Sequence, residues 1–269
     1  MYEEPYRWVE AVGNRRQYLD EQFKQGSPVV ALSYADGVLL LTVSKGTPKL
    51  YEIYDRIGLG GMGHPADLEK LRFSLLEMAH LEGFNRSPSD VTGARLMKYG
   101  LAPVIKQAFE EIYKAPYIVK VLLAELGTKP EKDAFLTVNY DGTFEERGGM
   151  AVLAATPAIQ QMMIRVLSEA REALPAATLA QAFEMALSAW AVGSLGQSGT
   201  DDGDGREGMA GPQTNEWSDR GGWAAQLRDV LRERTVECAV LERRVSGSSR
   251  YRTLAPDEVA RILPADVKG

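Results

Sequence analysis

Two β-rich runs on either side of an Asp-Gly pair constrain the fold more than any other feature of this chain. Residues 29–34 read Val-Val-Ala-Leu-Ser-Tyr and residues 38–43 read Val-Leu-Leu-Leu-Thr-Val, with Asp36 and Gly37 between them. An Asp-Gly pair in this position is a strong short-range signal for a β-hairpin. A third run over residues 50–57 leads into Gly58, Gly60, Gly61 and Gly63. We therefore expect a hairpin, a third strand over 50–57 and then a glycine-rich turn.

The rest of the chain places pairs of helices between groups of strands. Helical spacing of apolar residues predicts helices over residues 5–24, 65–83, 89–113, 157–173, 177–195 and 256–263, with another short helix at Trp223. Strand-like runs occupy residues 117–126, 135–140, 150–154, 236–243 and 250–254, and the Asp141-Gly142 pair predicts a further hairpin. Consecutive helices between groups of strands indicate stacked layers and not alternating β-α-β crossovers.

Composition excludes several classes of function. The formal net charge is −6, which is opposite to the basic footprint of a nucleic-acid-binding protein. No apolar stretch approaches the roughly 18 to 20 residues that span a bilayer, and acidic residues follow Met1 where a secretory signal carries basic ones. The single cysteine, Cys238, excludes a disulfide framework and fits a reducing compartment. We expect a cytoplasmic protein with no nucleic-acid or membrane partner.

An acidic, glycine-rich stretch interrupts the pattern of helices and strands after residue 196. It contains Asp201, Asp202, Asp204 and Glu207 and has almost nothing to bury, so we expect a solvated surface loop. We therefore divide the chain into four parts. Residues 1–24 form an N-terminal segment and helix, and residues 25–196 form the first part of the core. Residues 197–234 form a flexible acidic insertion with an extra helix, and residues 235–269 supply the last strands and a C-terminal helix to the same domain.

The glycine cluster matches the G-x-G-x-x-G pattern from Gly58 to Gly63, between a predicted strand and a predicted helix. In dinucleotide-binding folds, such glycines let a pyrophosphate approach a helix N-terminus. That fold also needs a second parallel strand directly after the helix, ending in an acidic residue. Here a second helix follows instead. A structural glycine turn is the favoured interpretation, and a dinucleotide-dependent oxidoreductase is the weakest alternative.

Ser27 is the one nucleophile that the sequence places in a catalytic context. In N-terminal-nucleophile hydrolases, processing exposes a Thr, Ser or Cys at the start of the first strand, and its own α-amine acts as the base. Ser27 stands at that place, but Pro28 restricts it, and neither an Asp at position 43 or 44 nor a suitably spaced lysine completes the set. A plain strand-leading serine is the favoured interpretation, and a self-processing hydrolase is the alternative. His64 and His80 lack further ligands at metal spacing, so we expect no metal and no cofactor.

Several segments, taken in order, carry a family resemblance that covers nearly everything except the acidic loop. They are residues 15–19, 27–32, 34–39, 49–58, 90–93, 137–142 and 237–241. Together they resemble the α subunits of 20S proteasomes, and the bacterial branch most closely. The resemblance implies an α+β fold, a four-layer αββα sandwich of the N-terminal-nucleophile hydrolase type. It also implies a non-catalytic subunit that forms seven-membered rings with neighbouring α subunits, caps catalytic β subunits and gates substrate entry for protein degradation.

The resemblance further implies site residues. Lys49 matches the lysine that receives the C-terminal carboxylate of an AAA+ ATPase activator between adjacent α subunits, and Gly63 would flank the same pocket. An ammonium can hold a carboxylate as a point charge, although Lys49 can also be read as an ordinary surface lysine. The gate residues would be Tyr2, Pro5, Tyr6 and Arg7, with Tyr18 in the helix behind them and Trp8 in place of the usual turn proline.

Overall fold

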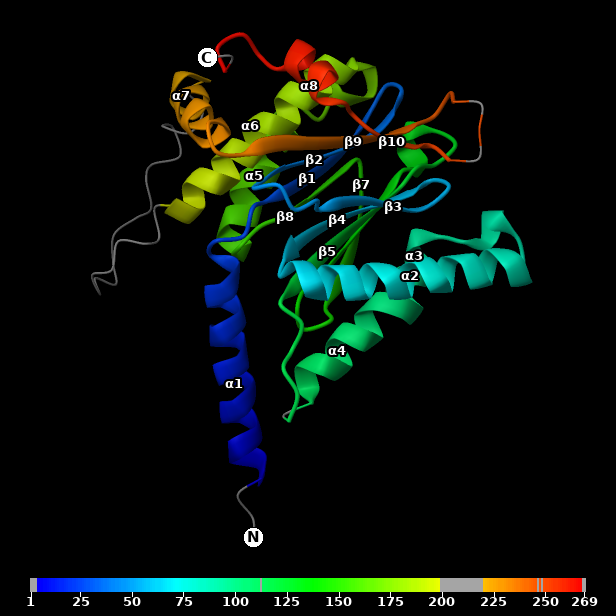
Figure 1. Cartoon of the computed structure of the whole chain (residues 1–269), viewed down its shortest axis with the longest axis vertical. Helices are drawn as coiled ribbons and strands as arrows, with labels where there is room; N and C mark the ends of the chain where they lie inside the picture. Colours follow the sequence, from blue (N-terminus) through cyan, green and yellow to red (C-terminus); the bar gives the residue numbers. More distant parts are fainter. Residues whose placement is uncertain (1–3, 112, 199–219, 246, 248, 268–269) are drawn as a thin grey trace.

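Two antiparallel sheets packed face to face form the centre of the molecule (Figure 1). The computed structural model describes residues 4–111, 113–198, 220–245, 247 and 249–267. One sheet has the order β10 (Tyr251–Thr253), β9 (Thr235–Glu242), β2 (Gly37–Ser44), β1 (Val29–Tyr34) and β8 (Met150–Leu153). The other has the order β3 (Leu50–Tyr54), β4 (Ile57–Gly63), β5 (Val119–Glu125), β6 (Ala134–Val138) and β7 (Phe144–Gly148). Neighbouring strands pair antiparallel throughout both sheets.

Helices cover the outer face of each sheet. The β3–β7 sheet is covered by α2 (Pro65–Asn85), with the short α3 (Gly93–Arg95) and α4 (Ala102–Glu110) beside it. The β10–β8 sheet is covered by α5 (Pro157–Glu169) and α6 (Leu179–Ser198). Two further helices, α7 (Arg220–Leu231) and α8 (Pro256–Ile262), contact α6. This arrangement confirms the expected four-layer αββα sandwich. The expected acidic loop falls mostly on residues 199–219, outside the described residues.

The first hairpin forms as expected, but its turn lies one residue earlier than the Asp-Gly pair suggested. Tyr34 pairs with Gly37, so Ala35 and Asp36 are the turn residues. Gly37 belongs to β2, where a Cβ atom would lie 1.9 Å from the carbonyl oxygen of Leu241 in β9. A glycine is required here because the neighbouring strand approaches closely, and not because the turn demands it.

The glycine cluster at 58–63 is a buried strand, so the prediction of a turn there was wrong. The turn is formed by Asp55 and Arg56, and the strand expected over 50–57 accordingly ends at Tyr54. In β4, a Cβ atom on Gly60 would lie 2.7 Å from Val29 Cγ1 of the opposite sheet, and one on Gly61 would lie 2.3 Å from Leu68 Cδ1 of α2. The glycines therefore let β4 pack closely on both faces. They form no loop that could cradle a pyrophosphate.

The single helix predicted over residues 89–113 is also wrong, because the chain there is broken into pieces. A short 3-10 turn (Pro88–Asp90) precedes α3, a π-helical turn spans Leu96–Leu101, and α4 begins at Ala102. Pro103 in the first turn of α4 has no N–H to donate to the preceding turn. A wider π turn satisfies the backbone on its N-terminal side. The periodic apolar pattern that suggested one helix continues across the break.

Helix α1 (Glu4–Phe23) extends away from the rest of the molecule and is held by its C-terminal half (Figure 1). Leu19 and Phe23 are fully buried. The guanidinium of Arg15 donates hydrogen bonds to carbonyl oxygens at the C-terminal end of α4 and just beyond it, those of Ala108, Phe109, Glu111 and Lys114. The last carbonyl groups of a helix have no N–H of the following turn to accept, and a cation beside them also complements the helix dipole.

A buried ion pair joins the two sheets at the opposite end of the sandwich. Asp133 precedes β6 and is 3% exposed. Its carboxylate lies 2.8 Å from the guanidinium of Arg243, which directly follows β9. Arg243 also donates to the carbonyl oxygen of Gly127.

Cys238 is buried in β9, as the alternating pattern predicted. Among the described residues, no helix combines the length and the apolar character needed to cross a membrane.

Candidate functional site

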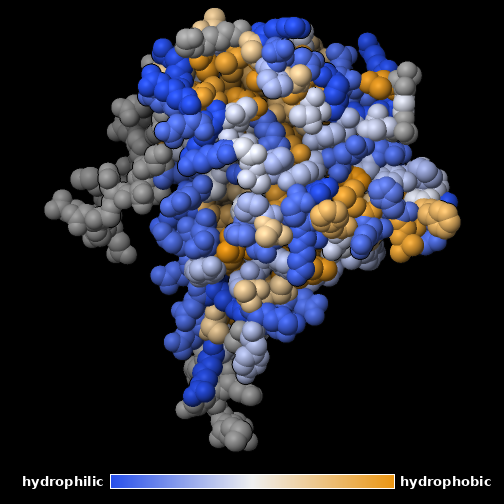
Figure 2. Space-filling model, viewed as in Figure 1, coloured by the Kyte–Doolittle hydropathy of each residue, from blue (hydrophilic) through white to orange (hydrophobic). Residues whose placement is uncertain are grey.

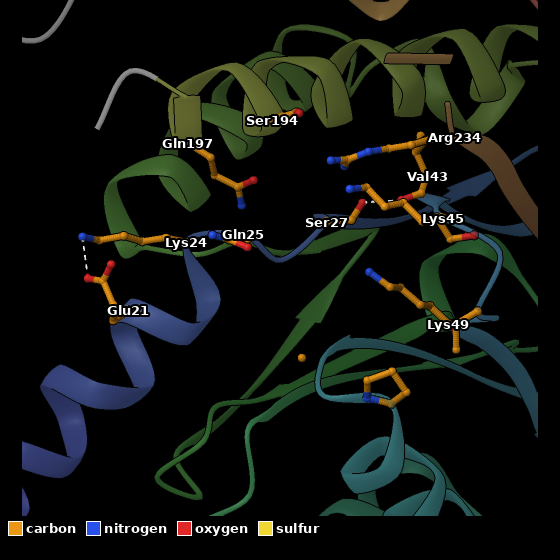
Figure 3. Close-up of a pocket in the computed structure, with 14 residues that line it drawn as sticks. Glu21, Lys24, Gln25, Ser27, Val43, Lys45, Lys49, Ser194, Gln197 and Arg234 are labelled. Atoms are coloured by element: carbon orange, nitrogen blue, oxygen red, sulfur yellow. Dashed lines mark hydrogen bonds and ion pairs between the residues drawn. The ribbon is translucent and has the colours of Figure 1, made fainter. Parts of the chain in front are cut away.

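A cavity of about 660 Å³ lies where α1, the loop between β2 and β3 and the start of α2 come together (Figure 3). We call it the basic pocket because Lys45, Lys49 and Arg234 line it. Its other lining residues include Glu21 and Lys24 of α1, Ser27, Val43 at the end of β2, Gly63 and Pro65 at the β4–α2 junction, and Ser194 and Gln197 of α6. Segments far apart in the sequence thus meet at one end of the sandwich.

Lys49 is positioned by a carboxylate behind it. The Glu237 carboxylate of β9 accepts hydrogen bonds from the backbone N–H of Lys49 at 2.9 Å and of Leu50 at 2.7 Å. These bonds fix the start of β3 against the other sheet and leave the Lys49 ammonium directed into the cavity (Figure 3). Burial lowers the pKa of this ammonium, the charge of Glu237 raises it, and the charge of Arg234 lowers it again. Lys49 is therefore half-buried, and the charge of Glu237 partly compensates its ammonium.

Gly63 lies on the lining of the same cavity as Lys49. Its φ angle is +131°, and a Cβ atom there would lie 2.0 Å from the carbonyl oxygen of Ile118. The same oxygen accepts the N–H of His64, whose side chain caps α2 by accepting the N–H of Ala66. Only glycine fits this backbone. The turn from β4 into α2 at the mouth of the pocket is therefore tightly defined.

The ends of three cationic side chains point into the pocket from one wall. Figure 3 shows Lys45, Lys49 and Arg234 directed toward the same space. The opposite side carries Glu21, which forms an ion pair with Lys24 at 2.6 Å. Sequence reasoning did not find Lys45 or Arg234. Arg234 was placed at the end of the acidic insertion, and no local signal indicates that it returns to the pocket.

Ser27 also lines the pocket, but its hydroxyl is fully engaged. The hydroxyl donates to the carbonyl oxygen of Val43 at 2.6 Å and accepts the indole N–H of Trp190 at 3.1 Å. In the full chain its nitrogen is the amide that joins it to the segment after α1. The structure does bring Lys49 to the same cavity, a lysine that spacing alone did not suggest. These contacts support the interpretation of Ser27 as a strand-leading residue.

The predicted gate residues lie partly outside and partly inside the described residues. Tyr2 lies outside the described residues. Pro5, Tyr6 and Arg7 lie in the first turns of α1, which begins at Glu4 and runs without a break through the position of Trp8. Tyr18 is on the same helix and is 49% exposed. The predicted gate and the helix behind it are therefore one continuous helix over the described part of α1.

The two histidines have local structural partners. His64 caps α2, and His80 Nδ1 lies 2.8 Å from the carbonyl oxygen of Leu76 with its ring edge-on to Tyr54. Within the part of the chain that the structure describes, no three potential metal-ligating side chains gather.

Comparison with known proteins identifies the family. A family model described as "Proteasome subunit" matches residues 23–196, from the end of α1 through most of α6. The proteasome subunit alpha of Actinosynnema mirum is 33% identical over 183 residues, which cover 67% of each chain. That of Streptosporangium roseum is 32% identical over 177 residues, or 65% of each chain. That of Streptomyces griseus is 27% identical over 267 residues, or 97% of this chain and 84% of its own. The chain therefore belongs to the proteasome subunit family, as a non-catalytic subunit of the bacterial α type.

Proposed function

We propose that this α-ring subunit gates substrate entry to a proteolytic chamber and docks an AAA+ ATPase activator at its basic pocket. The observation that carries the proposal is the position of Lys49 and Gly63 on the lining of one cavity, although they lie fourteen positions apart in the sequence. The activator would insert its C-terminus, and the Lys49 ammonium would hold the terminal carboxylate.

The geometry of the pocket supports this role. The Glu237 carboxylate fixes the backbone of Lys49 and Leu50, so the ammonium is held near its place before any ligand arrives. Because Lys49 is half-buried, its attraction to a carboxylate is less screened than at an open surface. A volume of about 660 Å³ falls within the range of pockets that enclose ligands larger than a single ion.

The gating part of the proposal rests on α1. This helix stands away from the body, and Trp8 and Val9 on it are 40% and 70% exposed. Apolar side chains on a projecting helix favour contact with a second surface, and we assign that surface to the neighbouring α subunit. The segment of Tyr2, Pro5, Tyr6 and Arg7 would then surround the axial entrance, with Tyr18 behind it.

The contact with β subunits is assigned to the outer face of α2. Phe73, Leu81 and Phe84 of this helix are 56%, 63% and 89% exposed, and Tyr99 in the π turn is 69% exposed. Figure 2 shows apolar side chains gathered at this part of the surface. Exposed apolar groups in such proximity mark an interaction surface. The single, buried Cys238 accords with the proposed cytoplasmic location.

Co-expression with the β subunit, which should carry an N-terminal threonine, tests the proposal. We expect ring-shaped particles whose hydrolysis of small fluorogenic peptides is stimulated by a peptide from the activator's C-terminus. Lys49→Ala should assemble and keep its basal hydrolysis but lose the stimulation. Lys129→Ala, at an exposed position outside the pocket, is the matched control and should be stimulated normally. Full stimulation of Lys49→Ala would overturn the docking role.

A further inference from the structure

Over its described lining residues, the basic pocket holds more positive charge than one carboxylate requires. Lys45, Lys49 and Arg234 converge from one wall (Figure 3). Among the described lining residues, the only carboxylate is that of Glu21, and it is paired with Lys24 on the opposite side. A single terminal carboxylate held by Lys49 would leave the other two cations of this wall without a ligand group.

This surplus charge has an energetic consequence. Like charges held close together in a partly buried site repel one another, and an anion relieves that repulsion. The lowering of the Lys49 pKa by Arg234 is a sign of this repulsion. Glu237 compensates only in part, because its carboxylate also accepts the backbone N–H groups of Lys49 and Leu50. The pocket is therefore arranged for a ligand with more than one negative group.

We infer that the basic pocket takes a peptide C-terminus that carries a second carboxylate, on the side chain of one of its last two residues. Lys49 holds the α-carboxylate, and Arg234 together with Lys45 holds the side-chain carboxylate. A guanidinium can bind a carboxylate through two parallel hydrogen bonds, which adds geometric selectivity to the charge. This inference rests on the proposed docking function and adds the chemistry of the partner's terminal residues.

The dimensions and surroundings of the pocket favour a peptide over a small inorganic anion. A volume of about 660 Å³ is far larger than a single ion fills. Pro65 adds an exposed apolar side chain to the lining beside the cations, which suits the rest of a peptide chain. The chain as a whole carries a net charge of −6, so the pocket is a local positive region that concentrates an acidic segment within it.

Three labelled peptides of otherwise identical sequence test the inference on the protein assembled with its β partner. The first has a penultimate Glu and a free C-terminus, the second has a penultimate Gln, and the third has the Glu but an amidated C-terminus. By fluorescence polarisation, we expect the first to bind about tenfold more tightly than the second, which corresponds to about 1.4 kcal/mol. The amidated peptide should also bind more weakly than the first, because it lacks the group that Lys49 holds.

Variants of the pocket assign the effect to its residues. Arg234→Gln should remove the preference for Glu over Gln while the Gln peptide binds as before, and Arg234→Lys should restore part of the preference. Lys45→Met is a second variant with the same expected direction. Arg228→Gln removes a charge at an exposed position of α7 outside the pocket and should leave the preference intact. Melting temperatures equal to the wild type exclude a folding defect.

The outcomes separate this inference from the docking proposal. Equal binding of the Glu and Gln peptides to the wild type, with both lost in Lys49→Met, overturns the dicarboxylate inference and leaves docking intact. No binding of either free-acid peptide overturns the docking proposal itself. Inorganic phosphate provides a last test. If phosphate displaces the Glu peptide when the phosphate concentration equals the dissociation constant of that peptide, the inference is overturned, because the pocket would then be a general anion site.

Discussion

A buried ammonium at the start of β5 makes the stability of this protein depend on pH in a way that one substitution removes. Lys120 is 9% exposed, and its Nζ donates hydrogen bonds to the carbonyl oxygens of Ala154 and Ala155, each at 2.9 Å. The ammonium also lies 4.7 Å from the centre of the Phe23 ring. Burial lowers its pKa from the ordinary 10.5 to about 8, against the opposing effect of the nearby Asp20 carboxylate.

The sign of the effect follows from which state binds the proton. Between pH 8 and pH 10.5 the folded protein loses the Lys120 proton while the unfolded chain keeps it. Stability rises with pH wherever the unfolded state binds more protons. The full shift from 10.5 to about 8 corresponds to about 3.4 kcal/mol at 1.36 kcal/mol per pH unit. Roughly 2 kcal/mol of this is gained between about pH 8 and about pH 10.

Guanidinium unfolding of wild type and Lys120→Met at a series of pH values tests this reasoning. Met keeps the length of the side chain and abolishes the titration. We expect the difference in unfolding free energy between the two proteins to change by roughly 2 kcal/mol from about pH 8 to about pH 10, in favour of the wild type. Lys98→Met, at an exposed position, controls for the loss of one positive charge. A wild-type-to-variant difference that stays constant over this range would refute the argument.

Three further substitutions test the packing and the role of Ser27. Gly61→Ala should destabilise the fold by about 1–3 kcal/mol, because its Cβ atom would enter the Leu68 side chain; thermal unfolding measures this, and Gly148→Ala, which meets open space, is the control. Asp133→Asn should cost roughly 3 kcal/mol in denaturant unfolding, because it leaves its partly buried partner Arg243 without a counter-charge. A loss below about 1 kcal/mol would contradict the assignment of a shielded ion pair. Ser27→Ala should lower the free energy of unfolding by roughly 1–3 kcal/mol and leave the peptide hydrolysis of the assembled complex unchanged. Intact-mass measurement of the wild type should find the chain uncleaved before residue 27.

The sequence allowed the layers of the fold to be predicted, because hydrophobic periodicity and turn residues act locally. The hairpin of β1 and β2, the strand β6 with its Asp141-Gly142 turn and the long helices α2, α5 and α6 all appear where their patterns indicated. The wrong prediction of a turn at the glycine cluster has a tertiary cause. Gly60 and Gly61 were read as turn residues because glycine favours turns, whereas here they admit a facing sheet and a helix to close packing. This close packing brings together segments that are distant in the sequence, so no local pattern indicates it.

The functional site divides in the same way. Family resemblance singled out Lys49 and Gly63, each lying in a segment whose local pattern can be read from the sequence. Arg234 and Lys45 carry no such pattern, because their importance arises only where the chain after α7 and the β2–β3 loop meet at one cavity. The sequence by itself thus determined most of the secondary structure and the family. Only the tertiary structure decided which charges share a pocket, since electrostatic coupling depends on distance in space and not along the chain.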